Sequence, residues 1–206
     1  ERGPQSREVV RGVRALDEEV GCNVVCLRGN HEAAWLRVVD EGWPEFILPP
    51  SNGCLPTMRS YRDGLDPDEL PSDAHLEALF KGSFFPPDVI EWMRTLPLFH
   101  EDEHAIYVHA GLIEKDGAFQ HPKDTEPKSA LLWTRSEEFL RDYRGKLVVI
   151  GHTSTECMPP ELSHYTPDDP SDMWVSEHVI AIDTQCGKGG FLTAVELPSL
   201  TVYESR

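Results

Sequence analysis

The sequence predicts a layered α/β domain with a mixed sheet. Short apolar segments that suit strands alternate with amphipathic segments that suit helices, which is the pattern of an α/β fold. The chain then closes on two apolar segments, residues 191–197 and 200–203, joined by a Pro-Ser turn, and this antiparallel pair makes the sheet mixed. With 206 residues the chain has the length of one ordinary domain, so we expect a single domain over residues 1–206.

The first elements are a helix, a strand and a second helix. Ser6 is placed to cap a helix that Gly21 ends, and its apolar face is formed by Val9, Val10, Val13, Leu16 and Val20. Residues 23–27 (NVVCL) read as a short apolar strand, and residues 33–39 as a helix. Residues 42–85 contain six prolines and many acidic side chains, so we expect a long irregular loop there.

The regular pattern returns at Pro86-Pro87, which opens a helix that runs through Met93. Strands are predicted at residues 105–108 (AIYV), 146–150 (KLVVI) and 179–182 (VIAI), and a helix at 130–143. Residues 156–177 form a second loop rich in proline and aspartate.

The charge and the cysteines limit the classes of partner. The 36 acidic and 19 basic residues give a net charge of −17, which disfavours nucleic acids and anionic membranes as partners bound by bulk charge. No run approaches the ~20 apolar residues of a membrane span. The five cysteines are an odd number without a CxxC pair, and we interpret them as reduced thiols of a cytoplasmic protein.

Three predicted strands stop at a possible metal ligand beside a glycine. They lead into Gly29-Asn30-His31, His109-Ala110-Gly111 and Gly151-His152. A single histidine after a strand is most often a capping or core residue, but three repeats of the arrangement favour one shared site, because ligands bind at the carboxyl ends of strands. Imidazole and amide ligands suit Mn, Fe, Co or Zn.

The same residues resemble the calcineurin-like metallophosphoesterases, and more narrowly the PPP-type Ser/Thr protein phosphatases and their bacterial relatives. The resemblance runs in family order over nearly the whole chain. Its motifs are Arg2-Gly3-Pro4, Leu27-Arg28-Gly29-Asn30-His31-Glu32, Val108-His109-Ala110-Gly111-Leu112, Leu132-Trp133-Thr134-Arg135, Gly151-His152-Thr153 and the closing residues 181–194.

The resemblance implies a role for each matching position. Asn30, His109 and His152 match ligands of one metal of a dinuclear pair, and His31 matches the catalytic acid. Arg2 and Arg135 match the arginines that hold the phosphoryl oxygens. It implies two divalent ions, with Mn²⁺ expected and Fe or Zn as alternatives. It also implies a phosphoprotein or a phosphorylated small molecule as the substrate.

The chain departs from the family pattern at several positions. The Gly-Asp-x-His motif and the Gly-Asp-x-x part of the second motif are missing, so we expect an N-terminally incomplete domain or a site with fewer metals. Glu1 stands where the family has an Asp, and Gln185 where it has a Gly. Asp183 lies at a strand end and is either a turn residue or part of the site.

Two further functions stay open. The same scaffold serves symmetrical dinucleoside tetraphosphatases, and Trp43, Tyr61, Tyr165 and Trp174 could stack a base or simply pack their loops. The missing ligands would also suit a non-catalytic domain that only binds phosphoproteins.

Overall fold

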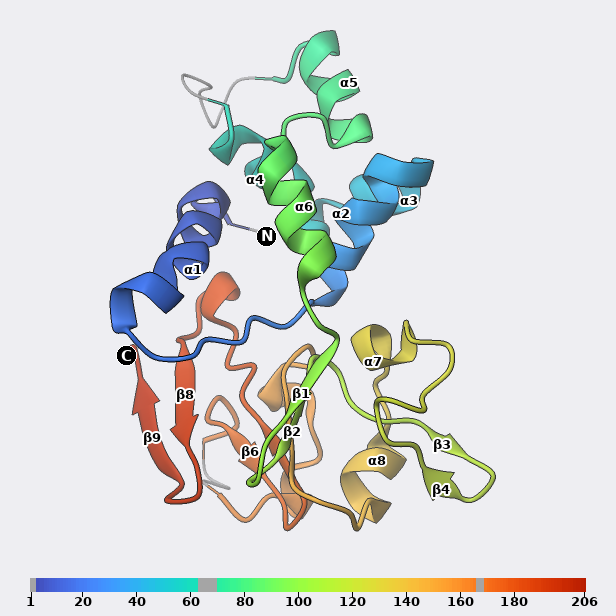
Figure 1. The fold of residues 1–206 in the computed structure, drawn as a ribbon, viewed down its shortest axis with the longest axis vertical. Helices are drawn as coiled ribbons and strands as arrows, with labels where there is room; N and C mark the ends of the chain where they lie inside the picture. The colour runs from blue at the N-terminus through green and yellow to red at the C-terminus, as the bar shows by residue number, and fades with distance from the viewer. Residues whose placement is uncertain (1–2, 63–69, 166–168) are drawn as a thin grey trace. The chain divides into compact units, whose positions relative to one another are not determined.

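The computed structural model describes residues 3–62, 70–165 and 169–206. Their contacts divide the chain into two compact units (Figure 1). The first, helical unit comprises residues 1–26 and 31–96, and the second, sheet unit comprises residues 27–30 and 97–206. The expectation of a single domain over residues 1–206 stays a prediction.

The helical unit is built around buried aromatic side chains. Trp35 is fully buried, and its ring meets those of Phe46, Phe84 and Phe85 edge-on, with centroids 5.2–5.5 Å apart. Its helices are α1 (Ser6–Val20), α2 (Asn30–Glu41), α3 (Pro44–Ile47), α4 (Cys54–Ser60), α5 (Asp73–Lys81) and α6 (Pro87–Thr95), with the 3-10 turn η1 (Pro50–Asn52). Edge-to-face contacts of this kind add to the stabilisation from burial.

Helix α1 ends where the sequence predicts, but it starts one residue earlier and buries a different set of side chains. Gly21 ends it in the left-handed conformation at φ 63°, as expected. Ser6 is not the cap: it is the first helical residue, and its hydroxyl donates to the carbonyl of Gly3. Of the five expected apolar residues only Val10 is buried, whereas Val9 and Val20 are exposed.

The irregular loop expected at residues 42–85 is wrong where α3, η1, α4 and α5 fall within it, and residues 63–69 of that segment lie outside the described residues. Pro44 and Pro50 begin α3 and η1 instead of breaking a helix, since proline is tolerated where no backbone donor is needed. Ser72 caps α5 by accepting from the backbone N–H of His75.

The sheet unit contains a five-stranded mixed sheet, which confirms the fold class. The strand order is β1-β2-β5-β7-β6, with β2, β5 and β7 parallel and the two outer strands antiparallel. The bounds are β1 (Phe99–Glu101), β2 (Ile106–Val108), β5 (Val148–Ile150), β6 (Trp174–Val175) and β7 (Val179–Ala181). Two hairpins accompany it, β3 (Glu114–Lys115) with β4 (Ala118–Phe119), and β8 (Thr193–Glu196) with β9 (Thr201–Glu204). The closing hairpin forms a sheet of its own, so the five-stranded sheet is mixed because of β1 and β6 and not because of this hairpin, as the sequence had suggested.

The alternation of side chains along the central strands creates two apolar faces. Val148 and Ile150 share one cluster with Leu131 and Phe139, so α7 (Ala130–Trp133) and α8 (Glu137–Asp142) cover that face. Val149 points to the other cluster, which includes residues of the β8–β9 hairpin. Both faces of the central strands are therefore covered within the sheet unit.

Two further predictions need correction. Residues 23–27 are not a strand: they form an irregular segment, because a short apolar run does not by itself fix the backbone conformation. The helix expected at 130–143 is broken into α7 and α8 at residues 134–136, where the Ser136 hydroxyl accepts from the N–H of Phe139 and starts α8.

Candidate metal and phosphate site

His109 and His152 meet because their strands are parallel neighbours. β2 ends at Val108 and β5 at Ile150, and both carboxyl ends lie at the same edge of the sheet. The backbone N–H of Gly151 donates to the carbonyl of His109 at 2.9 Å, which ties the two loops together. The imidazole centroids are 5.0 Å apart.

Asn30 joins them from a distant part of the sequence. The N–H of Arg28 donates to the carbonyl of Pro97 at 2.8 Å, just before β1, and so anchors residues 27–30 to the sheet unit. The side chain of Asn30 is buried, and its Oδ1 lies 2.9 Å from Nε2 of His109. The structure therefore brings together the three side chains that the sequence predicted as ligands.

His152 adopts a backbone conformation that costs free energy. Its φ is 65°, in the left-handed region that a residue with a Cβ rarely occupies. Such conformations cost about 1–3 kcal/mol and cluster at functional sites. Gly111, after the other histidine, has φ 150°, and a Cβ there would lie 3.2 Å from the side chains of Phe139 and Thr134.

Arg135 lies in the break between α7 and α8. Its Nη1 donates to Oγ1 of Thr153, the residue after His152, at 3.0 Å. The carbonyl of Leu131 in α7 accepts from the N–H of Ala110, next to His109, so the segment that carries Arg135 is tied to both histidine loops. Thr153 was not singled out as a site residue, although it stands in the Gly151-His152-Thr153 motif.

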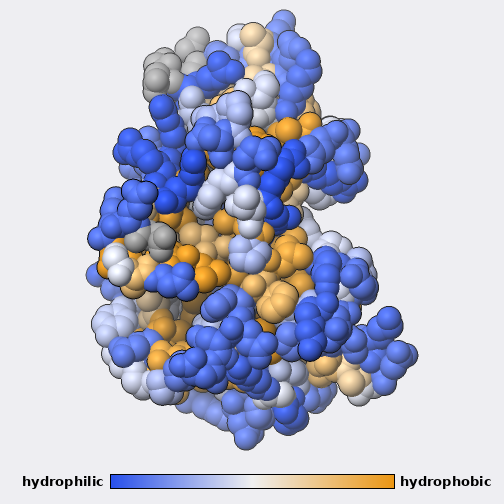
Figure 2. Space-filling view, in the orientation of Figure 1, coloured by the Kyte–Doolittle hydropathy of each residue, from blue (hydrophilic) through white to orange (hydrophobic). Residues whose placement is uncertain are grey.

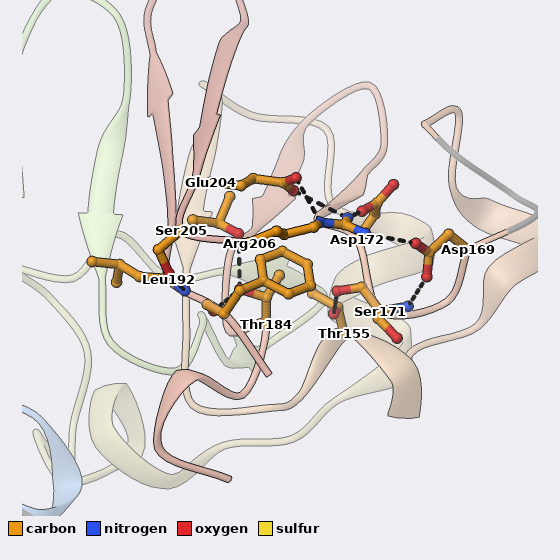
Figure 3. A network of polar contacts seen from close by, with 11 residues as sticks. Thr155, Asp169, Ser171, Asp172, Thr184, Leu192, Glu204, Ser205 and Arg206 are labelled. Carbon is orange, nitrogen blue, oxygen red and sulfur yellow. Dashed lines mark hydrogen bonds and ion pairs between the residues drawn. The ribbon is translucent and has the colours of Figure 1, made fainter. Parts of the chain in front are cut away.

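A network of polar contacts holds the loop that follows His152 (Figure 3). The N–H of Thr155 donates to the carbonyl of Asp183, and its hydroxyl to that of Ser171. Arg206 pairs with Asp169, Asp172 and Glu204, and its guanidinium lies 4.0 Å from the ring centroid of Phe191. The contacts of Arg206 therefore connect the loop that follows His152 to the end of the β8–β9 hairpin.

The remaining predicted site residues are placed differently. His31 belongs to the helical unit, where its ring is buried and meets that of Phe46 edge-on at 5.3 Å. Arg2 and Glu1 lie outside the described residues. Oδ1 of Asp183 accepts from the N–H of Gln185 at 3.3 Å, as a turn residue would. Gln185 itself has φ 62°, the conformation that favours the glycine of the family pattern.

The aromatic side chains considered for base stacking are engaged in packing. Trp43 stacks on Phe46 and lies under the guanidinium of Arg37, and Tyr61 contacts Phe84 and Phe85. Trp174 is 3% exposed and donates from Nε1 to the carbonyl of Pro159, and Tyr165 packs on the second face of the sheet. These contacts favour the packing role for all four.

Comparison with models of known protein families shows to which family this chain belongs. The family model for calcineurin-like phosphoesterases matches residues 1–182. The chain belongs to the calcineurin-like phosphoesterase family. Among solved structures, a protein described as a "putative diadenosine tetraphosphatase" is similar in fold, with a TM-score of 0.50 and 18% identity over 99% of this chain and 75% of its own. No curated protein matches the chain.

Calcineurin-like phosphoesterases are metal-dependent hydrolases that use a dinuclear divalent metal site. The donors of Asn30, His109 and His152 fit one such ion, because they are the nitrogen and oxygen donors that first-row divalent metals accept. Among the described residues, no group of three or more His, Cys, Asp or Glu side chains is gathered for a metal. Asn30, His109 and His152 therefore account for one ion of the pair.

No helix in the described part of the chain is long and apolar enough to cross a membrane. Hydrophilic residues cover much of the face drawn in Figure 2, in keeping with the net charge of −17. Phosphate binding by such a chain has to depend on local cations rather than on the overall charge.

Proposed function

We propose that this chain is a phosphomonoesterase that acts on phosphoserine and phosphothreonine in proteins. The observation that carries the proposal is the meeting of Asn30, His109 and His152 at one sheet edge, with Arg135 bonded to the residue after His152. A metal ion held by these ligands and the guanidinium group of a nearby arginine can together bind a phosphoryl group and balance its negative charge.

Asn30, His109 and His152 would hold one divalent ion, for which we propose Mn²⁺. Bound divalent metals supply a hydroxide at neutral pH and neutralise charge on the phosphoryl oxygens. The second ion of the dinuclear site would need acidic ligands beyond the three residues gathered here. A chain that binds metal weakly would instead act as a phosphoprotein-binding domain. Such a domain would bind a phosphopeptide without hydrolysing it, so turnover distinguishes it from an enzyme.

Arg135 would orient the phosphoryl group. Its Nη1 is engaged by Thr153, which fixes the plane of the guanidinium and leaves other N–H groups of the same fork for phosphate oxygens. We propose Arg2 as a second such arginine and His31 as the general acid that protonates the leaving alkoxide. The ring of His31, in α2, is buried against Phe46, so it has few rotamers to lose on binding substrate.

A second candidate is the hydrolysis of a symmetrical dinucleoside tetraphosphate, because the similar solved structure carries that description. The packing contacts of Trp43, Tyr61, Tyr165 and Trp174 favour the phosphoprotein instead, since each of these rings already packs against other side chains of its unit. We therefore place the dinucleotide second. A cytoplasmic location, where thiols stay reduced, accords with five free cysteines.

The test compares turnover of two substrates by the Mn²⁺-loaded chain. A phosphoserine peptide and diadenosine tetraphosphate are supplied at equal concentration, and the release of phosphate and of nucleotide is followed. We expect kcat/KM for the peptide to be the larger by at least tenfold. A preference for the dinucleotide would overturn the protein-phosphatase assignment, and turnover of neither would favour the binding domain.

A further inference from the structure

A cavity of about 220 Å³ opens beside Arg135 in the sheet unit, and the function proposed above does not use it. We infer that this cavity, called here the Arg135 cavity, is a subsite for an apolar side chain next to the phosphorylated residue of a peptide substrate. This inference rests on the proposed function and names the substrate feature that the site selects.

The position of the cavity connects it to the candidate site. Its wall includes Arg135 itself, Ala110, which follows His109, and Thr153, which follows His152. A phosphoryl group held by Arg135 is therefore at the cavity's edge. Because successive residues of an extended peptide are about 3.3–3.6 Å apart, the residue next to the phosphorylated one can reach the cavity.

The size and the lining of the cavity suit one apolar side chain. Its apolar lining residues come from α8, β5 and the loop after His152, and they are Phe139, Leu140, Ile150, Met158 and Pro159. An apolar protein cavity of about 150 Å³ binds benzene, so about 220 Å³ is enough for a leucine, methionine or phenylalanine side chain.

The hydroxyl groups of the cavity argue against a nucleobase as the occupant. Oγ1 of Thr153 accepts from Arg135, and the Ser136 hydroxyl donates to Glu138 and accepts from the N–H of Phe139. Both hydroxyls that line the cavity are thus engaged. Of the other charged residues in the lining, Arg135 is assigned here to the phosphoryl group, and Glu137 pairs with Arg141 at 3.7 Å. The polar edge of a base would have to take one of these groups from its partner, whereas an apolar side chain needs no polar partner on leaving water.

The first test measures the preference for an apolar neighbour. Phosphoserine peptides with Leu or Ser at the positions next to the phosphoserine are compared by kcat/KM, with p-nitrophenyl phosphate as a substrate that has no such neighbour. We expect the Leu peptide to be favoured about tenfold, the scale that apolar pockets provide. In Cys157→Phe, whose ring would fill the mouth of the cavity, this ratio should fall to about one.

Cys186→Phe is the matched control. Cys186 is an exposed cysteine in a 3-10 turn, as Cys157 is, but it does not line the cavity. The control should keep the tenfold ratio. Equal ratios in the two variants, or no preference in the unchanged chain, would overturn the inference.

The second test reads the cavity without turnover. The chain has four methionines, and Met158 is the one that lines the cavity, so its ¹³C-methyl NMR signal should shift when the Leu phosphopeptide is added. The signal of Met93, buried in the helical unit, should not move. A shift caused by diadenosine tetraphosphate and not by the peptide would show a base subsite and overturn the inference.

The two tests separate this inference from the function on which it rests. Failure to hydrolyse p-nitrophenyl phosphate with Mn²⁺ bound would remove the proposed function, while the Met158 signal would still report whether the peptide enters the cavity. Hydrolysis without any preference or shift would remove only the subsite.

Discussion

Replacing Gln185 by glycine should stabilise the protein, because the backbone at this position already has the conformation that glycine prefers. Gln185 has φ 62°, where a Cβ costs about 1–2 kcal/mol. Glycine loses roughly 0.5–1 kcal/mol more backbone entropy on folding, which leaves a net gain of about 0.5–1 kcal/mol. In a chain of this length a gain of 1 kcal/mol raises Tm by roughly 2–4 °C.

The local hydrogen bonds support that estimate, because all of them belong to the backbone of Gln185. Its N–H donates to Asp183, and its carbonyl accepts from the N–H groups of Lys188 and Gly190 at 2.8 and 3.0 Å. Gln185→Gly keeps all three. The expected increase in Tm, measured by calorimetry or circular dichroism, is therefore about 1–4 °C.

Two other variants test whether backbone strain at position 185 limits the stability of the protein. Gln185→Ala removes the side chain but keeps the strain, so it should not raise Tm. Gly190→Ala should lower Tm, because its Cβ would clash with the carbonyl oxygen of Thr184. If Gln185→Gly and Gln185→Ala had the same Tm, backbone strain at this position would not limit stability.

The other predictions concern the candidate site and the half-buried Tyr107. His109→Ala and His152→Ala should each lower the Mn²⁺ content of the loaded and desalted chain, measured by elemental analysis, whereas His100→Ala, on β1, should not. His31→Asn should lower kcat about 10²-fold with metal content unchanged, and an unchanged kcat on a poor leaving group would contradict the general-acid role. Arg135→Lys should lower kcat/KM about tenfold or more, because the ammonium group cannot replace the fork, and Lys128→Arg serves as a charge-conserving control. Burial and a hydrogen bond to Asp102 raise the pKa of Tyr107 to about 12, so its contribution to stability is complete below pH 10 and is lost as the pH rises to about 12. Denaturant titrations of Tyr107→Phe should show a weaker loss of stability over that pH range.

The parallel strands of the sheet and their site residues were predictable from short patterns. The segments 105–108, 146–150 and 179–182 are apolar and of strand length, and each contains the strand expected of it, β2, β5 or β7. Because parallel strands end at one edge, the histidines that follow two of them had to meet, as they do at 5.0 Å. The closing hairpin followed from its Pro-Ser turn in the same way.

Several predictions of secondary structure that were made from local composition alone were wrong. Residues 23–27 have the composition of a strand but form an irregular segment, because a short apolar run does not by itself fix the backbone conformation. The helix expected at 130–143 is interrupted because the Ser136 hydroxyl satisfies a backbone donor and begins α8 there. In residues 42–85 the prolines were read as breakers, whereas Pro44 and Pro50 stand at positions where a helix begins.

The sequence by itself determined the fold class, the family and the identity of three metal-ligand candidates, because these depend on local composition and on motifs read in order. Only the tertiary structure decided that Asn30 reaches His109, that Thr153 holds Arg135, and that a cavity of about 220 Å³ opens beside that arginine. Each of those features joins residues that are 18 or more positions apart in the chain or depends on how side chains fill space. Such contacts are fixed by packing and not by spacing along the sequence.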